Sequence, residues 1–167
     1  MSNGKIAKLG HLGIHVRDLE RSKAFYGGIL GLAATDMDPK SGATFFSSRP
    51  DDEHHEIFLA PGRTAAEGEV LVQQISFRCD TLEDVLAFHK RLKAAGVEIE
   101  QIVTHGNAIG IYFFDPDRNR CEIYWDTGLK AKQPFKVPIN LDQPVDRIIE
   151  DINGLVRKYG ETGVRLA

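Results

Sequence analysis

The sequence has few cysteines, no long hydrophobic run and no dense basic cluster, and each absence excludes a class of protein. Its two cysteines, Cys79 and Cys121, lie far apart without CxxC spacing, so we expect free thiols in a reducing cytoplasm. No apolar run approaches the length of a membrane span. The first residues, MSNGKIAKLG, lack the apolar segment of a signal peptide. These features predict a cytoplasmic protein that does not cross a membrane.

The composition and charge of the chain exclude a further class of binding partner. Charged residues make up 27% of the 167 residues, hydrophobic residues make up 42%, and the formal net charge is −3. This composition is typical of a soluble globular protein, and the absence of a lysine- and arginine-rich patch predicts no nucleic-acid partner. The length suits one domain or two small halves that share a core.

One phrase occurs twice in the chain. PDDEHHEIFL recurs as PDRNRCEIYW, so Glu56 and Glu122 occupy the same place in each copy. HLGIHVRDLERSKAFY, which begins at His11, matches QISFRCDTLEDVLAFH, which begins at Gln74, in its apolar pattern. Two matched segments in the same order predict a duplicated module.

Each half of the chain predicts a strand, a helix and then further short strands, which together make a βαβββ unit. Asp18 and Thr81 are candidate N-caps of the two helices, and Gly31 and Gly96 are placed to end them. The predicted fold class is therefore α+β, with two βαβββ modules and a C-terminal helix.

We expect the modules at about residues 8–62 and 70–128, within one domain that spans 1–130, and a C-terminal extension at 131–167. Apolar residues at helical spacing in this extension predict an amphipathic helix, with Asp142 as its N-cap and Pro144 near its first turn. The apolar stripe of this helix would pack on the domain or dock on a second subunit.

Polar residues stand at matching strand positions in the two modules. His11 and Gln74 lie on the first strands and Glu56 and Glu122 on the last, opposite the apolar residues by strand alternation. Two related modules can bring these side chains to one pseudo-twofold axis, where imidazole, amide and carboxylate groups suit a divalent metal. The alternatives are a hydrogen-bonded strand histidine for His11, a charged turn for Glu56, and a hydrogen bond to metal-bound water for Gln74.

Other histidines are interpreted from the faces on which they lie. His15 shares a face with His11, so it would line a substrate cavity or supply a ligand in another register. Adjacent strand residues point to opposite faces, so we interpret His54 and His55 as a turn-proximal pair. His89 lies opposite the apolar stripe of the second helix and is expected to face solvent.

Over roughly residues 8–130, the pattern resembles the vicinal oxygen chelate superfamily. That superfamily includes glyoxalase I, extradiol catechol dioxygenases, methylmalonyl-CoA epimerase, and bleomycin- and fosfomycin-resistance proteins. The resemblance implies that the paired modules form an open cup-shaped sheet around a metal, with His11, Glu56, Gln74 and Glu122 at the ligand positions. It also implies a small-molecule substrate with vicinal oxygens and, by analogy with members of this size, a homodimer.

The stretch THGNAIGIYFFDPDRNRCEIYW is similar to the last module of extradiol ring-cleaving dioxygenases. The similarity implies that His105 acts as acid or base near bound oxygen, that Tyr112 hydrogen-bonds the substrate, and that Asn107 contacts it. The alternatives are a turn histidine and a packed tyrosine. The chain departs from the pattern at Gln74, where the dioxygenases have a second histidine, and at Arg118, where the turn usually has glycine.

Different features of the sequence favour different activities. The dioxygenase motif predicts an extradiol ring-cleaving enzyme with Fe²⁺. The set of His, Glu, Gln and Glu instead favours a glyoxalase I-type or epimerase-type isomerase or lyase with Ni²⁺, Co²⁺ or Zn²⁺, and Mn²⁺ is a further candidate. A third alternative is a resistance-type protein that binds its ligand without metal chemistry.

Overall fold

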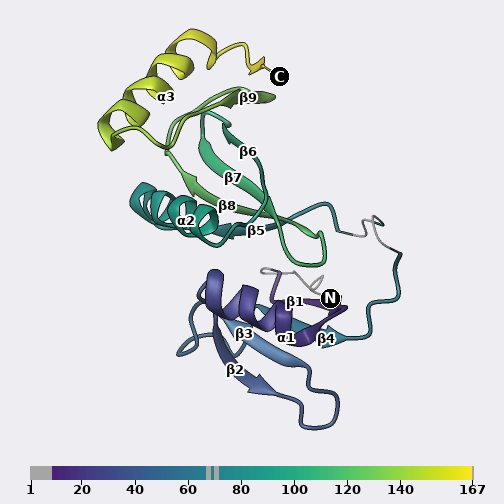
Figure 1. Ribbon diagram of the computed structural model, residues 1–167. Helices are drawn as coiled ribbons and strands as arrows, with labels where there is room; N and C mark the ends of the chain where they lie inside the picture. Colours follow the sequence, from purple (N-terminus) through teal and green to yellow (C-terminus); the bar gives the residue numbers. More distant parts are fainter. Residues whose placement is uncertain (1–8, 67–68, 70–71, 167) are drawn as a thin grey trace, which may run out of the picture. The chain divides into compact units, whose positions relative to one another are not determined.

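The computed structural model describes residues 9–66, 69 and 72–166 of the protein. The chain divides into two compact units, Met1–Glu69 and Val70–Ala167, and each unit builds its own sheet (Figure 1). The first unit contains β1 (Leu12–Val16), α1 (Leu19–Lys23), the π-helical segment η1 (Ala24–Ile29), β2 (Ala33–Met37), β3 (Thr44–Ser47) and β4 (Ile57–Pro61). The second contains β5 (Ile75–Arg78), α2 (Leu82–Ala94), β6 (Ile99–Thr104), β7 (Ala108–Phe114), β8 (Arg120–Asp126), β9 (Phe135–Pro138), α3 (Val145–Tyr159) and β10 (Val164–Arg165).

Both units have the same topology. In the first sheet β1 is parallel to β4, and β3 and β2 follow in antiparallel order. In the second sheet β5 is parallel to β8, and β7 and β6 follow in the same way. The predicted α+β class with paired βαβββ modules and a C-terminal helix is therefore confirmed. The segments β9 and β10 then continue the second sheet beyond β6.

The predicted ends of the first two helices are confirmed. The Asp18 carboxylate accepts a hydrogen bond from the backbone N–H of Arg21 at 3.0 Å, and the Thr81 hydroxyl accepts one from a backbone N–H in α2 at 3.2 Å. Gly31 and Gly96 have φ values of 78° and 66°, which an L side chain rarely adopts. Short local signals thus position both helices in their modules.

The start of α3 differs from the prediction. Pro144, and not Asp142, is the residue that precedes the helix, because its ring holds φ at −58° and its missing N–H needs no partner there. The Asp142 carboxylate instead lies 3.1 Å from the Nζ of Lys93 in α2. The described residues contain no helix with the length and apolarity needed to cross a bilayer.

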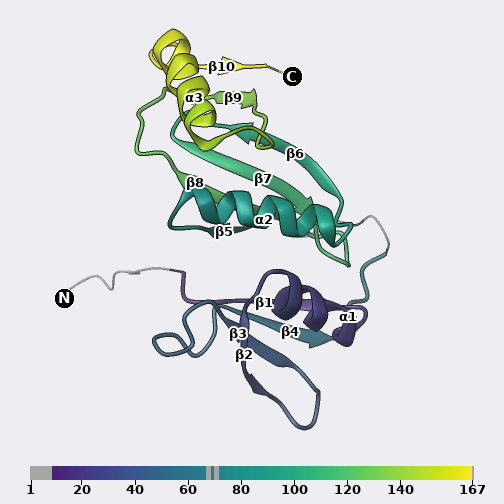
Figure 2. The same cartoon turned by 60° about the vertical axis from the view of Figure 1, so that its left-hand side comes forward.

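The core of the second unit lies between its sheet and α2, which runs along β8 and β5 (Figure 2). On the sheet, Ile109, Ile111 and Ile123 are at most 2% exposed. Cys121, which shares the face of Ile123, and Cys79 are both buried, and neither forms a disulfide. Because side chains alternate along a strand, the even-numbered residues of β7 and β8 face away from this core.

His89 is buried, which corrects the prediction that it faces solvent. It is 4% exposed, and its spacing from Val85 and Leu92 places it on the buried face of α2. Its Nδ1 lies 3.7 Å from the carboxylate of Asp142. Burial lowers the pKa of His89, and the opposing effect of Asp142 is smaller. The folded protein therefore favours neutral His89.

We expect the acid sensitivity of the fold to decrease in H89Q. The pKa of His89 is lowered from 6.5 on folding, so the unfolded chain takes up the proton more readily. This contribution to stability is present above pH 6.5 and is lost as the pH falls below it. Urea unfolding at about pH 7.5 and about pH 5.5 should show a smaller loss for H89Q than for wild type. The exposed neighbour Lys90→Gln is the control, and equal losses in H89Q and wild type would contradict the prediction.

Candidate functional site

A hollow of about 380 Å³ opens on the face of β7 and β8 that points away from the core of the second unit. Its lining includes the predicted residues His105, Asn107, Tyr112 and Glu122. The remaining lining residues are Ser76, Ala108, Tyr124, Asp126 and Gln133. The structure therefore brings the predicted acid–base residues and one predicted metal ligand to one concave surface.

Glu122 lies opposite Tyr112 in the β7–β8 register and is 6% exposed. Its Oε2 accepts hydrogen bonds from the Ser76 hydroxyl at 2.6 Å and from the Gln74 amide at 3.2 Å. On its other side lies Gly110, where an added Cβ would stand 2.5 Å from Glu122 Oε1. The glycine provides the space that this buried carboxylate occupies.

The tautomer of His105 follows from its partners. Its Nδ1 lies 2.8 Å from the backbone carbonyl of Phe135, and a carbonyl only accepts, so Nδ1 carries hydrogen. Its Nε2 lies 3.0 Å from the Tyr112 hydroxyl. In neutral His105, Nε2 is therefore the nitrogen that accepts a proton, and it faces the hollow's tyrosine.

Tyr112 connects His105 to Glu122. Burial, followed by the hydrogen bond to Glu122 and repulsion from its charge, raises the pKa of Tyr112 well above its usual range, so the phenol keeps its proton. A single hydroxyl proton serves either His105 or Glu122. When His105 is neutral, Tyr112 donates to Nε2; when His105 is protonated, Nε2–H donates to the tyrosine oxygen and the hydroxyl can turn to Glu122. Tyr112 thus shares one hydrogen bond with His105 and lies opposite Glu122 in the strand register.

The C-terminal extension supports the loop that carries His105. Gln133 Nε2 donates to the backbone carbonyl of His105 at 2.9 Å, and β9 supplies the Phe135 carbonyl. Gly106, with φ of 73°, lies so near Ala131 that an added Cβ would be 2.5 Å from the alanine side chain. The sequence predicted only a packing or dimerising role for the extension, because no side-chain pattern indicates which carbonyl a histidine will meet.

Gln74 lies beside Glu122 but is also bound by an arginine. Arg120 Nη1 donates to Gln74 Oε1 at 3.2 Å, and Gln74 Nε2 donates to Ser76 Oγ at 2.9 Å. Ser76, Arg120 and Gly110 also belong to the surroundings of Gln74 and Glu122, although the sequence did not predict them. Alternation was the available signal, because Ser76 shares a face with Gln74, and Arg120 shares one with Glu122.

In the first unit, His11 and Glu56 lie next to each other where β1 and β4 begin. The backbone N–H of Leu12 donates to the Glu56 carbonyl at 3.0 Å. His11 is exposed, and its ring centroid lies 4.3 Å from that of His55. His15 is also exposed, and its Nδ1–H donates to the Pro61 carbonyl at 3.0 Å.

The Glu56 carboxylate is engaged by the segment that follows β3. It accepts hydrogen bonds from the Ser48 N–H at 2.8 Å and the Ser48 hydroxyl at 2.5 Å, and Arg49 Nη2 lies 3.3 Å away. Burial raises the pKa of Glu56, but Ser48 and Arg49 together outweigh it and lower the pKa. Glu56 is an ionised carboxylate with protein partners on both oxygens.

His54 and His55 form the turn-proximal pair that was predicted, but they do not point to opposite faces. Their Nδ1 atoms lie 2.9 Å apart, because the chain bends here before β4 begins and strand alternation does not apply. Burial, followed by repulsion from His11 and His54, lowers the pKa of His55. His55 therefore stays neutral beside the predicted ligand His11.

The four predicted ligands suit a divalent metal only in part. Imidazole nitrogen and carboxylate oxygen, as in His11 and Glu122, suit Mn²⁺ or Fe²⁺. The other two predicted ligands, Glu56 and Gln74, are each engaged by an arginine. His11 and Glu56 lie in the first unit and Gln74 and Glu122 in the second. Within residues 9–66, 69 and 72–166, no group of three or more His, Cys, Asp or Glu side chains is arranged to hold a metal inside one cluster.

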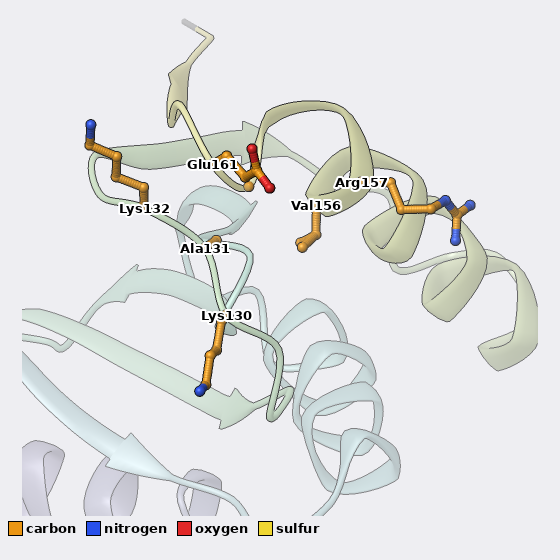
Figure 3. Close-up of a pocket in the computed structure, with 7 residues that line it drawn as sticks. Lys130, Ala131, Lys132, Val156, Arg157 and Glu161 are labelled. Carbon is orange, nitrogen blue, oxygen red and sulfur yellow. The ribbon is translucent and has the colours of Figure 1, made fainter.

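A larger hollow, of about 510 Å³, lies beside the C-terminal end of α3 (Figure 3). Lys130, Lys132 and Arg157 line it, but their charged ends point away from one another. The basic groups do not converge on a point where an anion would bind. The hollow on β7 and β8 is the better candidate site because its polar groups do converge.

Known proteins share the sequence pattern and the fold. The family model for the Glyoxalase/Bleomycin resistance protein/Dioxygenase superfamily matches residues 8–123. The manganese-dependent 2,3-dihydroxybiphenyl 1,2-dioxygenase of Geobacillus genomosp. 3 is 35% identical over 133 residues, which are 78% of this chain and 40% of that protein. Biphenyl-2,3-diol 1,2-dioxygenase 2 of Rhodococcus globerulus is 34% identical over 80 residues, which are 46% of this chain and 42% of that protein.

Solved structures include a neighbour of different activity. The genomically encoded fosfomycin resistance protein FosX of Listeria monocytogenes has a TM-score of 0.60 and 26% identity, over 74% of this chain and 94% of that chain. The matches to the two dioxygenases span only 40% and 42% of those longer proteins. The chain thus has dioxygenases as sequence relatives, and it has as a structural neighbour a resistance protein that it matches over nearly its whole length.

Proposed function

The chain belongs to the Glyoxalase/Bleomycin resistance protein/Dioxygenase superfamily, and from this premise we propose that it is a metal-dependent, extradiol-type ring-cleaving dioxygenase. The observation that supports this activity is the chain of contacts from His105 through Tyr112 to Glu122 on the wall of one hollow. Ring cleavage of an aromatic diol needs a group near its two hydroxyl oxygens that can accept a hydroxyl proton. His105 Nε2 and the Tyr112 hydroxyl meet that need.

The proposed substrate is an aromatic ring with two neighbouring hydroxyl groups. A hollow of about 380 Å³ falls within the range that small-molecule sites occupy. His105 accepts a hydroxyl proton at Nε2, Tyr112 hydrogen-bonds the same oxygen, and Asn107 contacts the substrate from the rim. In the balanced reaction both atoms of O₂ enter the product while one ring carbon–carbon bond breaks, so no further reductant is consumed. His15 stays a predicted substrate contact of the first unit.

Glu122 is the proposed metal ligand of the second unit, and His11 and Glu56 stay predicted ligands of the first unit. A divalent ion held by such ligands would supply Lewis acidity toward the diol and O₂. Fe²⁺ is the metal that the dioxygenase motif predicts, whereas the name of the Geobacillus relative specifies manganese. Mn²⁺ and Fe²⁺ are therefore the metals to compare, and the homodimer remains a prediction.

Glu122→Gln is expected to lose the metal and the activity together. The amide keeps the size of the side chain but removes the charge that binds a cation. Metal analysis of anaerobically purified protein, followed by oxygen uptake on a panel of catechols, should show near-stoichiometric Fe or Mn in wild type. We expect activity to fall more than about 100-fold in E122Q, since even an outer partner of a ligand is worth about 10- to 100-fold. Glu161→Gln, in the exposed turn that follows α3, is the matched control.

The outcomes of this experiment separate the candidate functions. Bound Ni²⁺, Co²⁺ or Zn²⁺ without oxygen uptake would favour the glyoxalase I-type or epimerase-type isomerase. Wild-type protein that neither contains nor takes up metal would exclude both enzymes and leave the resistance-type binding protein. Unchanged metal and activity in E122Q would contradict the role of Glu122.

A resistance enzyme is the second candidate, and the extent of the FosX match favours it. That match covers 94% of the FosX chain, and another FosX structure is described as a complex with Mn(II) and 1S,2S-dihydroxypropylphosphonic acid. Consumption of fosfomycin in the presence of Mn²⁺, without oxygen uptake on any catechol, would place this candidate first.

A further inference from the structure

Gln74 stands where the dioxygenase motif has a histidine, and its contacts indicate what its amide does. Its Oε1 accepts from Arg120 Nη1 at 3.2 Å. Its Nε2 donates to Glu122 Oε2 at 3.2 Å and to Ser76 Oγ at 2.9 Å. The amide therefore links a guanidinium on one side to a carboxylate on the other.

The chemistry of the two partners fixes which end of the amide faces which. A guanidinium only donates hydrogen bonds and an ionised carboxylate only accepts them. Turning the Gln74 amide over would place its NH₂ against Arg120 and its oxygen against Glu122, and both contacts would become repulsive. The amide oxygen, which is the atom a metal would bind, thus faces Arg120 and not the Glu122 carboxylate.

Arg120 is itself held in place. Its Nε donates to Glu100 Oε2 at 2.6 Å, and its guanidinium lies 4.3 Å from the centre of the Tyr112 ring. Its side chain is 18% exposed. Releasing the Gln74 oxygen toward a metal at Glu122 would remove one hydrogen-bond acceptor from Arg120, whose guanidinium is otherwise fixed by an ion pair and an aromatic ring.

We propose that Gln74 is a positioning residue and not a metal ligand. Arg120 orients its amide, and the amide N–H together with the Ser76 hydroxyl holds Oε2 of Glu122, so Oε1, on the Gly110 side, is the oxygen that would be left to bind a metal. This inference rests on the proposed function, because it takes Glu122 to be a ligand. It gives the polar contacts of Gln74, Ser76 and Arg120 one shared role, which is to hold the Glu122 carboxylate in place.

The test uses Co²⁺ as the probe, since its visible absorption bands report the number and kind of its ligands. Wild type, Gln74→Ala and Ser76→Ala are titrated with Co²⁺ alone, and both the stoichiometry and the band positions are measured. We expect each variant to keep the wild-type bands and stoichiometry while its Kd rises about 10- to 100-fold. Gln74→His, which introduces an imidazole, serves to show the band shift that a ligand at this position causes.

A double-mutant cycle that combines Arg120→Met with Gln74→Ala tests whether Arg120 acts through the Gln74 amide. We expect R120M to weaken Co²⁺ binding when Gln74 is present, and to have little further effect when it is combined with Gln74→Ala. Additive effects, or a change of the cobalt bands in Gln74→Ala, would overturn the inference while leaving the proposed function in place. Failure of wild type itself to bind Co²⁺, Mn²⁺ or Fe²⁺ would overturn the proposed function, and the inference with it.

Discussion

Gly110→Ala is expected to abolish most of the activity while the second unit remains folded. The added Cβ would lie 2.5 Å from Glu122 Oε1 and 3.2 Å from Tyr112 Cε2. Its nearest neighbour is the end of a flexible side chain, so the carboxylate, and not the sheet, will give way. A displacement of about 1 Å at a reacting centre can lower a rate about 100-fold. We expect a loss of at least this size in kcat, together with weaker metal binding.

This prediction is checked by kcat, metal content and urea unfolding, measured on one preparation. Gly28→Ala is the matched control, because a Cβ added at Gly28 meets nothing within 4 Å. A loss of activity with a nearly unchanged unfolding transition supports the role of Gly110 as the space for the carboxylate. Wild-type kcat and metal content in Gly110→Ala would show that the position of Glu122 does not matter for the reaction.

His105→Gln and Tyr112→Phe are each expected to lower kcat by about 10²- to 10⁴-fold, the range for loss of a general acid or base. Glutamine can still donate to the Phe135 carbonyl but cannot carry a proton at the position of Nε2. Phenylalanine preserves the packing of Tyr112 but breaks the link to Glu122. Because the two residues share one hydrogen bond of 3.0 Å, their effects should not add.

The double variant measures this coupling. We expect its kcat to be close to that of the more damaged single variant, at saturating catechol and O₂. Tyr159→Phe, a tyrosine at the end of α3, is the control for loss of a phenol elsewhere. If the two losses multiply, His105 and Tyr112 act independently, and the coupling proposed for them is wrong.

Local sequence signals predicted the framework of the molecule well. Asp18 and Thr81 begin their helices because a capping oxygen needs only a backbone N–H within the next turn. Gly31 and Gly96 end them because few other residues adopt a positive φ. The repeated phrase predicted equivalent modules, and the two sheets have equivalent strand orders. Such signals depend on neighbours in the chain, so they can be read without the fold.

Contacts between distant segments could not be predicted in the same way. The partner of His105 Nδ1 is a backbone carbonyl of β9, and no side chain at Phe135 signals it. The prediction placed His89 opposite the apolar stripe of α2, whereas its spacing from Val85 and Leu92 puts it on the buried face. Strand alternation placed Gln74 near Glu122, but the orientation of its amide depends on Arg120. Each of these features is set by tertiary packing.

The pairing of β5 with β8 also sets the order in which the site can assemble. These strands are the first and last of the second module, and their register joins Ser76 directly to Glu122 across the whole length of that module. The antiparallel hairpins β6–β7 and β7–β8 close short loops, whereas β5 must close the longest one, which has the greatest entropic cost. We therefore expect Glu122 to acquire these partners after the hairpins have formed. A chain that has formed only its hairpins would hold Glu122 without Ser76 and Gln74.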